Sequence, residues 1–543
     1  MTTDSPEDTT PAEAPEKEKA EAATVPKKAA KKAARKSAAK KAARAAKVPK
    51  SKALAKEPKV EAEKVEKQPV EVSPETPPET GDDEVKEVAA KEQPAKVDQE
   101  ATEVAAKKQP EDAEPEPEPK PLPPVPDFCD INELHKRPLS ELHKMAVEAE
   151  LRVAGIRSKH QLLFEILSYY ARRGTRIEGE GVLEYDGGGY GNIRWERYSF
   201  APLPDDIYVH NSVIRRHNLR PGLKLRCNIR TPREKDKFFS ADEVLTIEGI
   251  PIKDWVTPKK FDDLTALFPK DRIILETKKD ASISSRIVDL VAPLGKGQRG
   301  LINAPPRGGK TLLLKDIASS ISKNYPEIEL LVLLLDERPE EVTDFTETVN
   351  VQVYSSTFDE NPKRHIQVAE LVSERARRLV ELGKDVVILL DSLTRLARGY
   401  NQIQGGGRIG SGGIGTKALI KPRKFFGSAR NVEEGGSLTI IATALIETEN
   451  RMDEVIFEEF KGTGNMEISL DREMVEKRIF PALHILKSGT RNDDKLYHPE
   501  EFKRIAIMRR ELSQLPAVEA VEVLMRNLRA SGSNAEFLMK GLK

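Results

Sequence analysis

A glycine-rich segment that ends in lysine and threonine could bind a polyphosphate. Residues 304–311 read Ala-Pro-Pro-Arg-Gly-Gly-Lys-Thr and follow a short apolar run. Gly308 and Gly309 let backbone amides wrap phosphate oxygens, and Lys310 supplies a point charge to the β and γ phosphates. The Thr311 hydroxyl can ligate Mg²⁺. An apolar strand before the loop and a helix after it are the context that this motif requires, so the segment predicts an ATP site.

Two other apolar runs end in acids that could complete this chemistry. The run 386–390 leads into Asp391, which could hold the hydration shell of Mg²⁺. The run 331–335 leads into Asp336 and Glu337, and Glu337 could orient and polarise the attacking water. Carboxyl ends of parallel strands meet at one edge of a sheet, so both acids are expected beside the phosphate loop. Each acid could instead cap a neighbouring helix.

Phosphoryl transfer also gains from an arginine that meets the charge developing on the γ-phosphate, often supplied by a neighbouring subunit. Arg478 and Arg491 are candidates for this role, and Phe480 could stack on adenine. The sequence leaves open which subunit either arginine faces. The glycine-rich stretch 405–413 carries one cation, Arg408, and suits a moving grip on a polyanion.

A second set of side chains upstream could bind single-stranded nucleic acid. Flat aromatic rings are interleaved with cations, which is typical of such surfaces. The aromatic members are Tyr190, Trp195, Tyr198, Tyr208, Phe238 and Phe239, and the basic members are Arg194, Arg197, Arg215, Arg216 and Lys237. Core packing is the alternative for some of them, above all Trp195 and Phe200.

The elements that must position these sites follow from period and composition. Helical spacing after Pro138 and a capping box at Ser158 and Gln161 predict a small helical subdomain over 127–175. Strands around Val182, Ile193, Ile207, Leu225 and Val244 predict an OB or cold-shock barrel over 176–250. A linker is expected over 251–279 and a RecA-like α/β ATPase domain over 280–543. The fold class expected is therefore multidomain, α+β followed by α/β.

Residues 1–126 contain no aromatic side chain and one glycine, so a disordered, charged tail is expected there. The whole chain has 89 basic and 89 acidic residues. Lys27–Lys50 concentrates basic residues without an acid, which fits either auxiliary nucleic-acid binding or a solvated linker balanced by the acidic stretch 111–118.

The sequence shows neither a membrane span nor a signal peptide, so a soluble, cytoplasmic protein is expected. Cys129 and Cys227 are the two cysteines and lack metal-ligand spacing. They are expected to be structurally inert.

Several longer motifs resemble those of the bacterial transcription termination factor Rho family. They are the phosphate loop and the segments 336–343, 391–398, 430–437 and 460–465, which read DERPEEVT, DSLTRLAR, RNVEEGGS and FKGTGN. The resemblance runs from about residue 130 to the C-terminus. It implies a hexameric, RNA-dependent ATPase and helicase that translocates 5′ to 3′ on transcripts, unwinds RNA–DNA hybrids and releases RNA from RNA polymerase.

The resemblance also implies site residues. The ATP pocket would contain Gly295, Lys296, Gly297, Gln298, Arg299, Gly300, Arg307, Gly308, Gly309, Lys310, Thr311, Leu312 and Arg338, with Glu337 as the base, Asp391 on magnesium and Arg491 as the finger. The primary RNA site would contain Gly189, Tyr190, Gly191, Asn192, Ile193, Arg194, Asp206, Ile207, Tyr208, Asp236, Lys237 and Phe238. The secondary RNA site would contain Arg408, Arg451 and Lys461. The family commonly has an aromatic residue at Asn192 and usually has lysine at Arg408 and Arg451.

Two other functions compete with this one. A rotary or export ATPase of the same fold would move protein, and its hydrolysis would not depend on RNA; the aromatic, basic barrel argues against it. A passive RNA-binding protein would have lost Lys310, Glu337 or Asp391, and all three are present.

Overall fold

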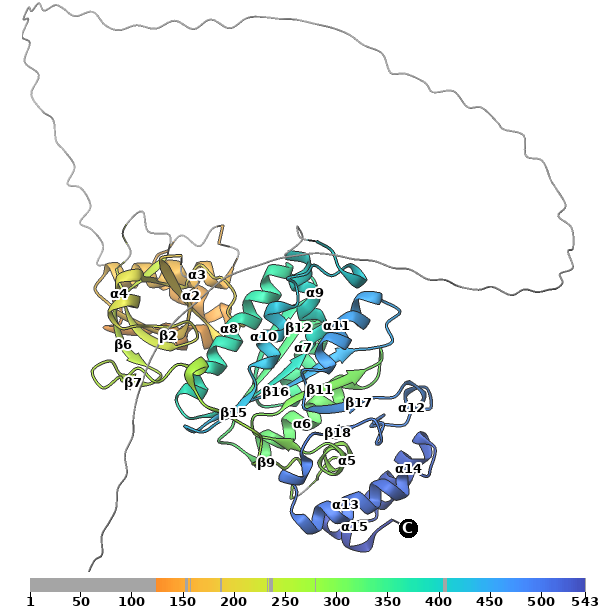
Figure 1. Cartoon of the computed structure of the whole chain (residues 1–543). Coiled ribbons are helices and arrows are strands. Elements are labelled where there is room, and N and C mark those ends of the chain that lie inside the picture. The colour runs from red at the N-terminus through yellow and green to blue at the C-terminus, as the bar shows by residue number, and fades with distance from the viewer. Residues whose placement is uncertain are drawn as a thin grey trace, which may run out of the picture. The chain divides into compact units, whose positions relative to one another are not determined.

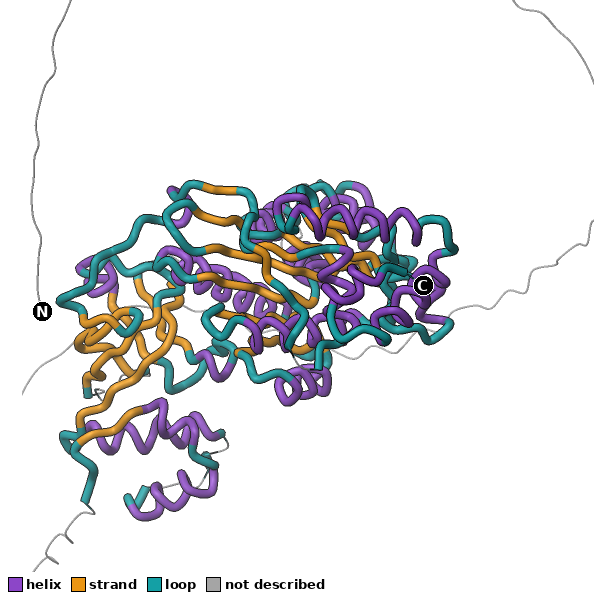
Figure 2. The backbone as a smooth tube through the Cα atoms, turned by 90° about the horizontal axis from the view of Figure 1, so that it is seen from below, coloured by secondary structure: helices purple, strands orange, loops and turns teal. Residues whose placement is uncertain are grey.

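The computed structural model describes residues 124–542 apart from 152–154, 157, 186–187, 232, 234–237, 279 and 404–407. The Lys27–Lys50 block, almost all of the predicted tail, Asp236 and Lys237 lie outside the described residues. Figures 1 and 2 show that the described chain begins with helices and a strand-rich body and continues into a larger body of parallel strands and helices.

The first elements are one short strand and three helices: β1 (Phe128–Asp130), α1 (Ile131–Lys136), α2 (Leu139–Glu148) and α3 (Lys159–Arg172). The Ser158 side chain caps α3 by accepting from the N–H of Gln161, as the capping box predicts. β1 pairs in parallel with the first barrel strand, and the helices share one hydrophobic core with the barrel. The helical segment is therefore packed onto the barrel.

The barrel is built from β2 (Arg176–Tyr185), β3 (Tyr190–Arg194), β4 (Ile207–His210), β5 (Lys224–Arg230) and β6 (Phe239–Ile247), with β7 (Ile250–Pro251) beside β6. A 3₁₀ turn, η1 (Glu196–Tyr198), and α4 (Asn211–Arg216) lie between strands. The strand order is β2-β3-β4-β6-β5, and β5 pairs back with β2, which closes the barrel. The five predicted strands and the OB-like fold are confirmed.

The segment predicted as a linker contributes to the second body. It contains η2 (Phe261–Asp263), β8 (Ala266–Leu267) and β9 (Arg272–Ile273). β8 pairs with β15 (Arg430–Val432) and β9 pairs with β10 (Leu294–Gly295). Phe261 and Ile273 are fully buried, which explains why this segment is held against the ATPase domain.

The second body is a RecA-like α/β domain, as predicted. Its main sheet has the order β13-β12-β14-β16-β11-β17-β18. The strands are β11 (Arg299–Ala304), β12 (Glu329–Glu337), β13 (Gln352–Thr357), β14 (Asp385–Asp391), β16 (Ser437–Leu445), β17 (Met466–Ser469) and β18 (Gly489–Thr490). All of these pairs are parallel except the one between β17 and β18.

Helices cover both faces of this sheet because both faces of its strands are apolar. Val332 and Leu334 face one helical layer and Leu333 and Leu335 face the other. The first layer contains α5 (Ile283–Val291), α6 (Lys310–Asn324), α7 (Pro339–Thr348), α12 (Arg472–Glu476), α13 (Pro499–Leu512), α14 (Ala517–Arg529) and α15 (Asn534–Lys540). The second contains α8 (Pro362–Glu381), α9 (Leu393–Ile403), α10 (Ile420–Gly427) and α11 (Arg451–Lys461). Two 3₁₀ turns, η3 (Ser411–Gly413) and η4 (Asp493–Lys495), complete the described elements.

Helix α8 contacts both the sheet and the barrel. Its apolar side chains pack under β12, β13 and β14. On the barrel side, Arg375 Nη1 lies 2.5 Å from Glu248 Oε1 and Arg220 Nη1 donates to Glu381 Oε1 at 2.9 Å. Within the described residues, no helix is long and apolar enough to span a membrane.

Candidate ATP and RNA sites

The phosphate loop lies where the sequence predicts it, between β11 and α6. Gly309 is the N-cap of α6 and has a φ of 82°, a left-handed conformation that glycine adopts without strain. Lys310 and Thr311 form the first turn of the helix, so the free N–H groups of that turn and the helix dipole favour an anion there.

The Lys310 side chain is bound by both predicted acids. Its Nζ lies 2.8 Å from Glu337 Oε1 and 2.6 Å from Asp391 Oδ2. Glu337 ends β12 and Asp391 ends β14, so the strand-end argument places them correctly. The other Asp391 oxygen, Oδ1, accepts a hydrogen bond from the Thr443 hydroxyl of β16 at 2.7 Å. The structure thus brings the cation and the two acids together.

Burial and charge alter the protonation of this triad. Burial alone would lower the pKa of Lys310, but the Asp391 and Glu337 carboxylates outweigh it and raise that pKa. Burial and then the negative charge of Asp391 raise the pKa of Glu337 above its usual range. A carboxylate with a raised pKa is a stronger proton acceptor, which suits a residue that activates water.

Sequence reasoning missed two residues that hold these acids. Arg395 on α9 donates to the backbone oxygen of Asp336 and lies 3.6 Å from Glu337 Oε1. Thr443 orients Asp391 from the neighbouring strand. Arg395 follows Asp391 by one helical turn, which is a usable signal, whereas Thr443 stands inside an apolar run and gives none.

Phe480 lies directly over the phosphate loop. A Cβ atom built on Gly309 would be 3.3 Å from its ring, and the ring is 41% exposed. Arg478, two residues earlier, is exposed on the same loop, and Arg307 and Arg338 are exposed at the same edge of the sheet. Leu312 is 62% exposed in the first turn of α6, which is unusual for a large apolar side chain. A nucleotide base has apolar and aromatic surface available beside the loop.

Arg491 lies at the opposite edge of the sheet. It follows β18, and its N–H donates to the carbonyl of Asn465, the residue before β17. Asn465 in turn contacts Arg299 at the start of β11, whereas the phosphate loop follows the end of β11. Arg491 lies at the level of the first residue of β11 and the phosphate loop follows its last residue. At roughly 3.3 Å per residue, the length of β11 separates them by about 16 Å.

The structure does not bring six of the predicted ATP-binding residues to the phosphate loop of the same chain. Gly295, Lys296, Gly297, Gln298, Arg299 and Gly300 lie at the amino ends of the strands. There, Lys296 Nζ contacts Asp385 Oδ2 at 2.6 Å and the Gly297 N–H donates to Thr439 at 2.9 Å. They lie on the same edge as Arg491, because β11 runs away from this edge toward the loop.

On the barrel, two tyrosines form an exposed aromatic platform. Tyr190 on β3 is 51% exposed, and its ring stacks on Tyr208 of β4 with centroids 5.4 Å apart and planes 26° apart. His210 is the cross-strand partner of Tyr190, and its ring centroid lies 6.4 Å from that of Tyr208. His210 is not among the predicted RNA-binding residues, although its spacing of two from Tyr208 places it on the same face of the strand. Phe238 is 52% exposed.

The predicted run from 189 to 194 is not continuous on the surface. Alternate strand residues point inward, so Gly191 and Ile193 are buried, as is Ile207 on β4. Arg194 is largely occupied by carboxylates, since its Nε lies 2.6 Å from Glu184 Oε2 and its guanidinium also contacts buried Asp206. Gly191, Ile193 and Ile207 lie beneath the platform, whereas Arg194 lies on the same face of β3 as Tyr190. Gly189 has a φ of 101° and nothing within 4 Å of its Cβ position.

The loop that follows Arg408 packs against α11, the helix that begins at Arg451. Arg408 and Arg451 are exposed, and a Cβ atom on Gly412, in the loop after Arg408, would lie 2.8 Å from the carbonyl of Arg451. Lys461 lies at the other end of α11, about 15 Å along the helix axis at roughly 1.5 Å per residue. It lines a small cavity of about 360 Å³ together with Arg491.

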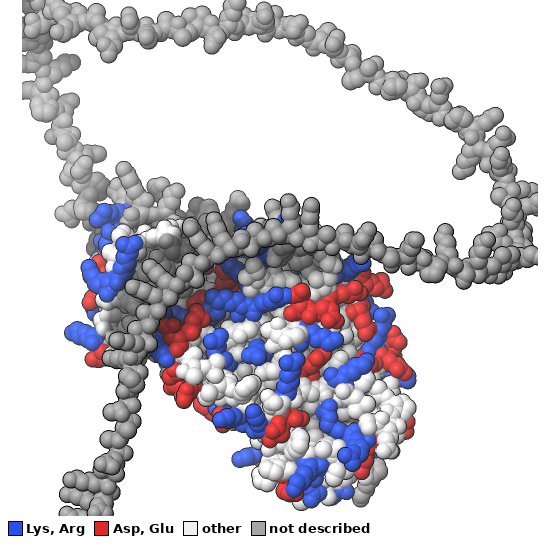
Figure 3. Space-filling model, viewed as in Figure 1, with Lys and Arg blue, Asp and Glu red and all other residues white. Residues whose placement is uncertain are grey.

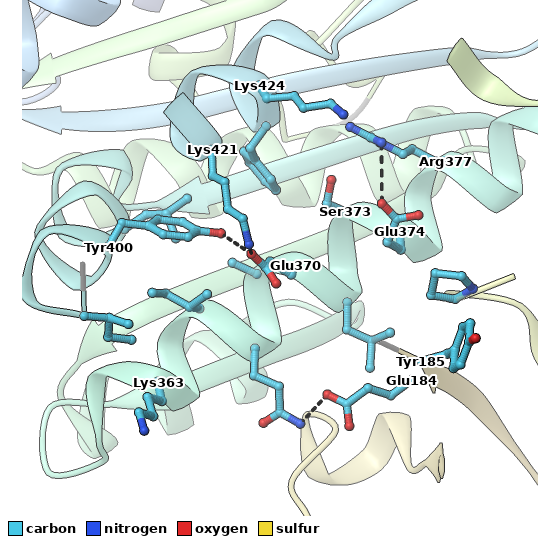
Figure 4. Close-up of a pocket in the computed structure, with 18 residues that line it drawn as sticks. Glu184, Tyr185, Lys363, Glu370, Ser373, Glu374, Arg377, Tyr400, Lys421 and Lys424 are labelled. Carbon is cyan, nitrogen blue, oxygen red and sulfur yellow. Dashed lines mark hydrogen bonds and ion pairs between the residues drawn. The ribbon is translucent and has the colours of Figure 1, made fainter. Parts of the chain in front are cut away.

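A cleft of about 630 Å³ lies between the barrel and helices α8, α9 and α10 (Figure 4). On the barrel side it is lined by Glu184 and Tyr185, whose strand pairs with β3 of the tyrosine platform. On the other side Tyr400 and Lys421 both contact Glu370 (Figure 4). The lining also includes Ile403, the last residue of α9, after which the chain continues toward Arg408. On its barrel side the cleft therefore lies beside the strand next to the tyrosine platform.

Charge is not segregated on the face of the molecule shown in Figure 3, where basic and acidic side chains alternate over the ATPase domain. Cys129 and Cys227 are both buried. Burial raises the pKa of Cys129 to about 11 and that of Cys227 to about 12, which keeps both thiols protonated and unreactive.

Comparisons with known proteins agree with this geometry. A model of the Rho termination factor RNA-binding domain matches residues 179–253, and a model of the nucleotide-binding domain of the ATP synthase alpha/beta family matches residues 284–490. The chain is 56% identical over 420 residues to transcription termination factor Rho of Akkermansia muciniphila, across 77% of this chain and 89% of that protein. It is 48% identical over 410 residues to transcription termination factor Rho of Pseudomonas aeruginosa, across 75% and 98%. Among solved structures it is similar to a prototypical ATPase from the type III secretion system of pathogenic bacteria, at 22% identity and a TM-score of 0.44, over 51% of this chain and 86% of that one.

Proposed function

The chain belongs to the transcription termination factor Rho family, with an RNA-binding domain and an ATPase domain, and we propose that it acts as a homohexameric helicase on nascent transcripts. In this proposal the ring binds single-stranded RNA, hydrolyses ATP only when RNA is bound, and moves 5′ to 3′. It then unwinds the RNA–DNA hybrid and releases the transcript from RNA polymerase in the cytoplasm.

The observation that carries this proposal is that α8 is bonded to both functional parts. Its Gln367 donates to Glu184 of the barrel at 2.6 Å, and Glu184 also pairs with Arg194, which lies on the same face of β3 as Tyr190. The same helix packs under the strands that carry Glu337 and Asp391. If RNA binding displaces the barrel, α8 would therefore transmit the displacement to the ATP site, because a tightly packed helix moves as a unit.

The residues present fit ATP with Mg²⁺. Asp391 and Thr311 offer the oxygen ligands that Mg²⁺ prefers, beside a loop shaped for phosphate. Bound Mg²⁺ would neutralise charge on the β and γ phosphates. Lys310 would bind those phosphates, Glu337 would orient and deprotonate the attacking water, and Phe480 would stack on the adenine.

The distance between Arg491 and the phosphate loop supports a shared site between subunits. An arginine side chain reaches roughly 7 Å from its Cα, well short of the strand length of about 16 Å that separates the two edges. We therefore propose that Arg491 meets the γ-phosphate of a neighbouring copy and not that of its own chain. Gly295 to Gly300 lie on the same edge as Arg491, so they would also approach the neighbour's nucleotide. This arrangement is that of a ring ATPase.

The single-stranded RNA would stack on Tyr190 and Tyr208 and continue to Arg408 and Arg451 near the centre of the ring. Asn192 is the cross-strand partner of Tyr208 and lies two residues after Tyr190 on β3. The resemblance implies an aromatic residue at this position, so Asn192 offers hydrogen bonds in place of a third stacking surface.

ATP hydrolysis measured with and without RNA tests the proposal. We expect hydrolysis to be stimulated by poly(C) and poly(U) and not by duplex DNA. Tyr190→Ala should raise the RNA concentration needed for stimulation, because base stacking contributes about 1–3 kcal/mol per base. Phe128→Ala is the matched control, because Phe128 on β1 is an aromatic side chain of similar exposure and lies outside the predicted RNA sites. Hydrolysis that is equally fast without RNA would instead support the rotary or export ATPase.

A further inference from the structure

Two histidines and one aspartate meet where the N-terminal helices contact the barrel. His135 Nε2 lies 2.5 Å from Asp205 Oδ2, and His160 Nδ1 lies 2.9 Å from Asp205 Oδ1. One donor atom from each of the three residues lies within 4.8 Å of the others. His135 lies in the last turn of α1, His160 lies in the first turn of α3, and Asp205 precedes β4. No step of the proposed ATPase or RNA-binding function uses this cluster.

The carboxylate of this cluster has no arginine or lysine partner among the described residues. Asp205 is fully buried, and both of its oxygens contact imidazoles only. Its neighbour Asp206, by contrast, pairs with Arg194. Lys159 lies close by, but its Nζ donates to the carbonyl of His135 at 2.7 Å. A buried carboxylate needs a compensating positive charge, and in this cluster either a protonated imidazole or a bound metal ion could supply it.

We propose that His135, His160 and Asp205 bind one Zn²⁺ ion. Two imidazole nitrogens and a carboxylate oxygen form a common protein donor set for zinc, which leaves a fourth position for water. Each imidazole would carry its proton on its other ring nitrogen and turn its lone pair toward the ion. The ion would take the place of the two N–H···O contacts, and its charge would compensate Asp205.

The surroundings of the cluster fit such a site. The His135 ring packs edge-on against Trp195 at 4.6 Å and Tyr198 at 5.2 Å, and the His160 ring packs edge-on against Tyr198 at 4.5 Å. These contacts fix the directions of the imidazoles, as outer-shell residues do in metal sites. The His160 side chain is 15% exposed, so the site has an entry path for the ion and for water.

The ion would join three segments that are distant in the sequence, namely α1, α3 and the loop that leads into Tyr208 of the platform. Because the ion would bind the folded chain and not the unfolded one, it would stabilise the folded state and fix the loop before β4. We therefore expect zinc to raise the thermal stability of the barrel.

The test uses the full chain purified without a histidine tag, stripped with a chelator and titrated with ZnCl₂ against a chromophoric competitor in excess Mg²⁺. We expect one zinc per chain with submicromolar affinity, and visible absorption when Co²⁺ replaces Zn²⁺. His160→Gln, which removes a ligand at the rim of the site, should weaken binding by more than the roughly 10–100-fold that the loss of an outer-shell partner costs. His143→Gln on α2, in the same helical segment, should bind zinc as the wild type does.

Asp205→Asn keeps the shape of the side chain and removes its charge, so it provides a second variant if His160→Gln does not fold. Circular dichroism reports the folding of each variant. A folded wild-type protein that binds no zinc in competition would overturn the proposal, as would equal loss of zinc in His143→Gln and His160→Gln. The cluster would then be a purely structural set of hydrogen bonds between the N-terminal helices and the barrel. This readout does not depend on ATPase activity.

Discussion

The ammonium group of Lys310 lies 2.6 Å from the carboxylate of Asp391, and the two residues are 81 positions apart in the chain. The lysine belongs to the phosphate loop and the aspartate to the end of β14, two strands away from β11 in the sheet. The ion pair joins the group that would bind phosphate to the group that would hold magnesium. A nucleotide with its metal would have to separate them, and the charges of the two ligands would then replace the partner that each side chain gives up.

Lys310→Ala should abolish ATP hydrolysis while leaving RNA affinity at the barrel largely intact. The lysine pairs with Glu337 and Asp391, and the tyrosine platform lies on another domain. Hydrolysis rates and RNA binding measured on the same preparation check this. Lys323→Ala, in the last turn of the same helix, should keep both activities. Equal loss of RNA affinity and hydrolysis in a folded Lys310→Ala protein would contradict the two-site arrangement.

Arg395→Gln should shift the acid limb of the pH profile of kcat to higher pH. Glu337 acts as a base only when ionised, so the rate falls as the pH drops through its pKa. The positive charge of Arg395 lowers that pKa against the opposing effects of burial and Asp391. Removing the charge therefore raises the pKa of Glu337 further, and the acid limb of the profile moves to higher pH.

The control for this experiment is Arg398→Gln on the same helix. Arg398 pairs with Asp453 at 2.5 Å, at the start of α11 and away from Glu337, so its removal should leave the limb in place. Profiles measured at saturating ATP and RNA decide between the two outcomes. An unshifted limb in Arg395→Gln would mean that another group sets it.

Gly222→Ala should weaken the coupling between RNA binding and hydrolysis. Gly222 has a φ of 86°, and a Cβ atom there would lie 2.4 Å from the backbone carbon of Glu374 on α8. The barrel would have to shift away from the helix. We expect RNA to stimulate hydrolysis less, while RNA affinity changes little.

Gly249→Ala is the matched control, because Gly249 has a φ of 78° in the same barrel and nothing within 4 Å of its Cβ position. It carries only the cost of the left-handed backbone, about 1 kcal/mol. Thermal unfolding of both variants reports the cost of the strained backbone. RNA-stimulated hydrolysis reports the displacement of the barrel from α8, which only Gly222→Ala should cause. Equal stimulation in the two variants would show that packing at Gly222 does not transmit the signal.

The ATP chemistry could be predicted from the sequence further than the RNA surface could. A strand, a glycine loop and a helix specify their own geometry, and strand ends share an edge, so the positions of Lys310, Glu337 and Asp391 agree with the prediction. Thr443 could not be found, because its role depends on which strand lies beside β14. Within the run at 189–194, strand period two turns Gly191 and Ile193 inward, so a contiguous stretch of sequence could not show which of its side chains are exposed. Gly295 to Gly300 lie far from their own phosphate loop because the direction of β11 carries the chain across the sheet between them.

Deleting residues 1–126 should lower RNA affinity in a salt-dependent way. The Lys27–Lys50 block holds basic residues without an acid, and each phosphate it neutralises releases counterions. On single strands the log-log salt slope of the truncated protein should be shallower by about 0.7 for each phosphate that the block neutralises. RNA affinities of the full-length and truncated proteins over a range of salt concentrations test this. Identical slopes would favour the solvated linker.

Arg491→Ala should lower kcat by a factor of roughly 10³–10⁵ while ATP affinity falls much less. The guanidinium meets charge that develops mainly in the transition state, so its loss appears in the rate before it appears in binding. Steady-state kinetics and nucleotide binding measured on the same variant check both parts. Arg510→Ala, a cation in the last turn of α13, is the control and should keep the wild-type rate.

Mixing subunits then decides which copy supplies Arg491. Arg491 and the phosphate loop lie at opposite edges of one sheet, so each site would draw its loop from one subunit and its arginine from the next. Arg491→Ala subunits mixed with Lys310→Ala subunits should regain ATPase activity, because some interfaces then pair an intact loop with an intact arginine. Subunit exchange has to be confirmed first. If the mixture then stays as inactive as its components, either Arg491 acts within its own chain or hydrolysis requires a ring in which every ATP site is intact. A titration of wild type with Arg491→Ala separates these, since a requirement for an unbroken ring makes activity fall far more steeply than the fraction of wild-type subunits.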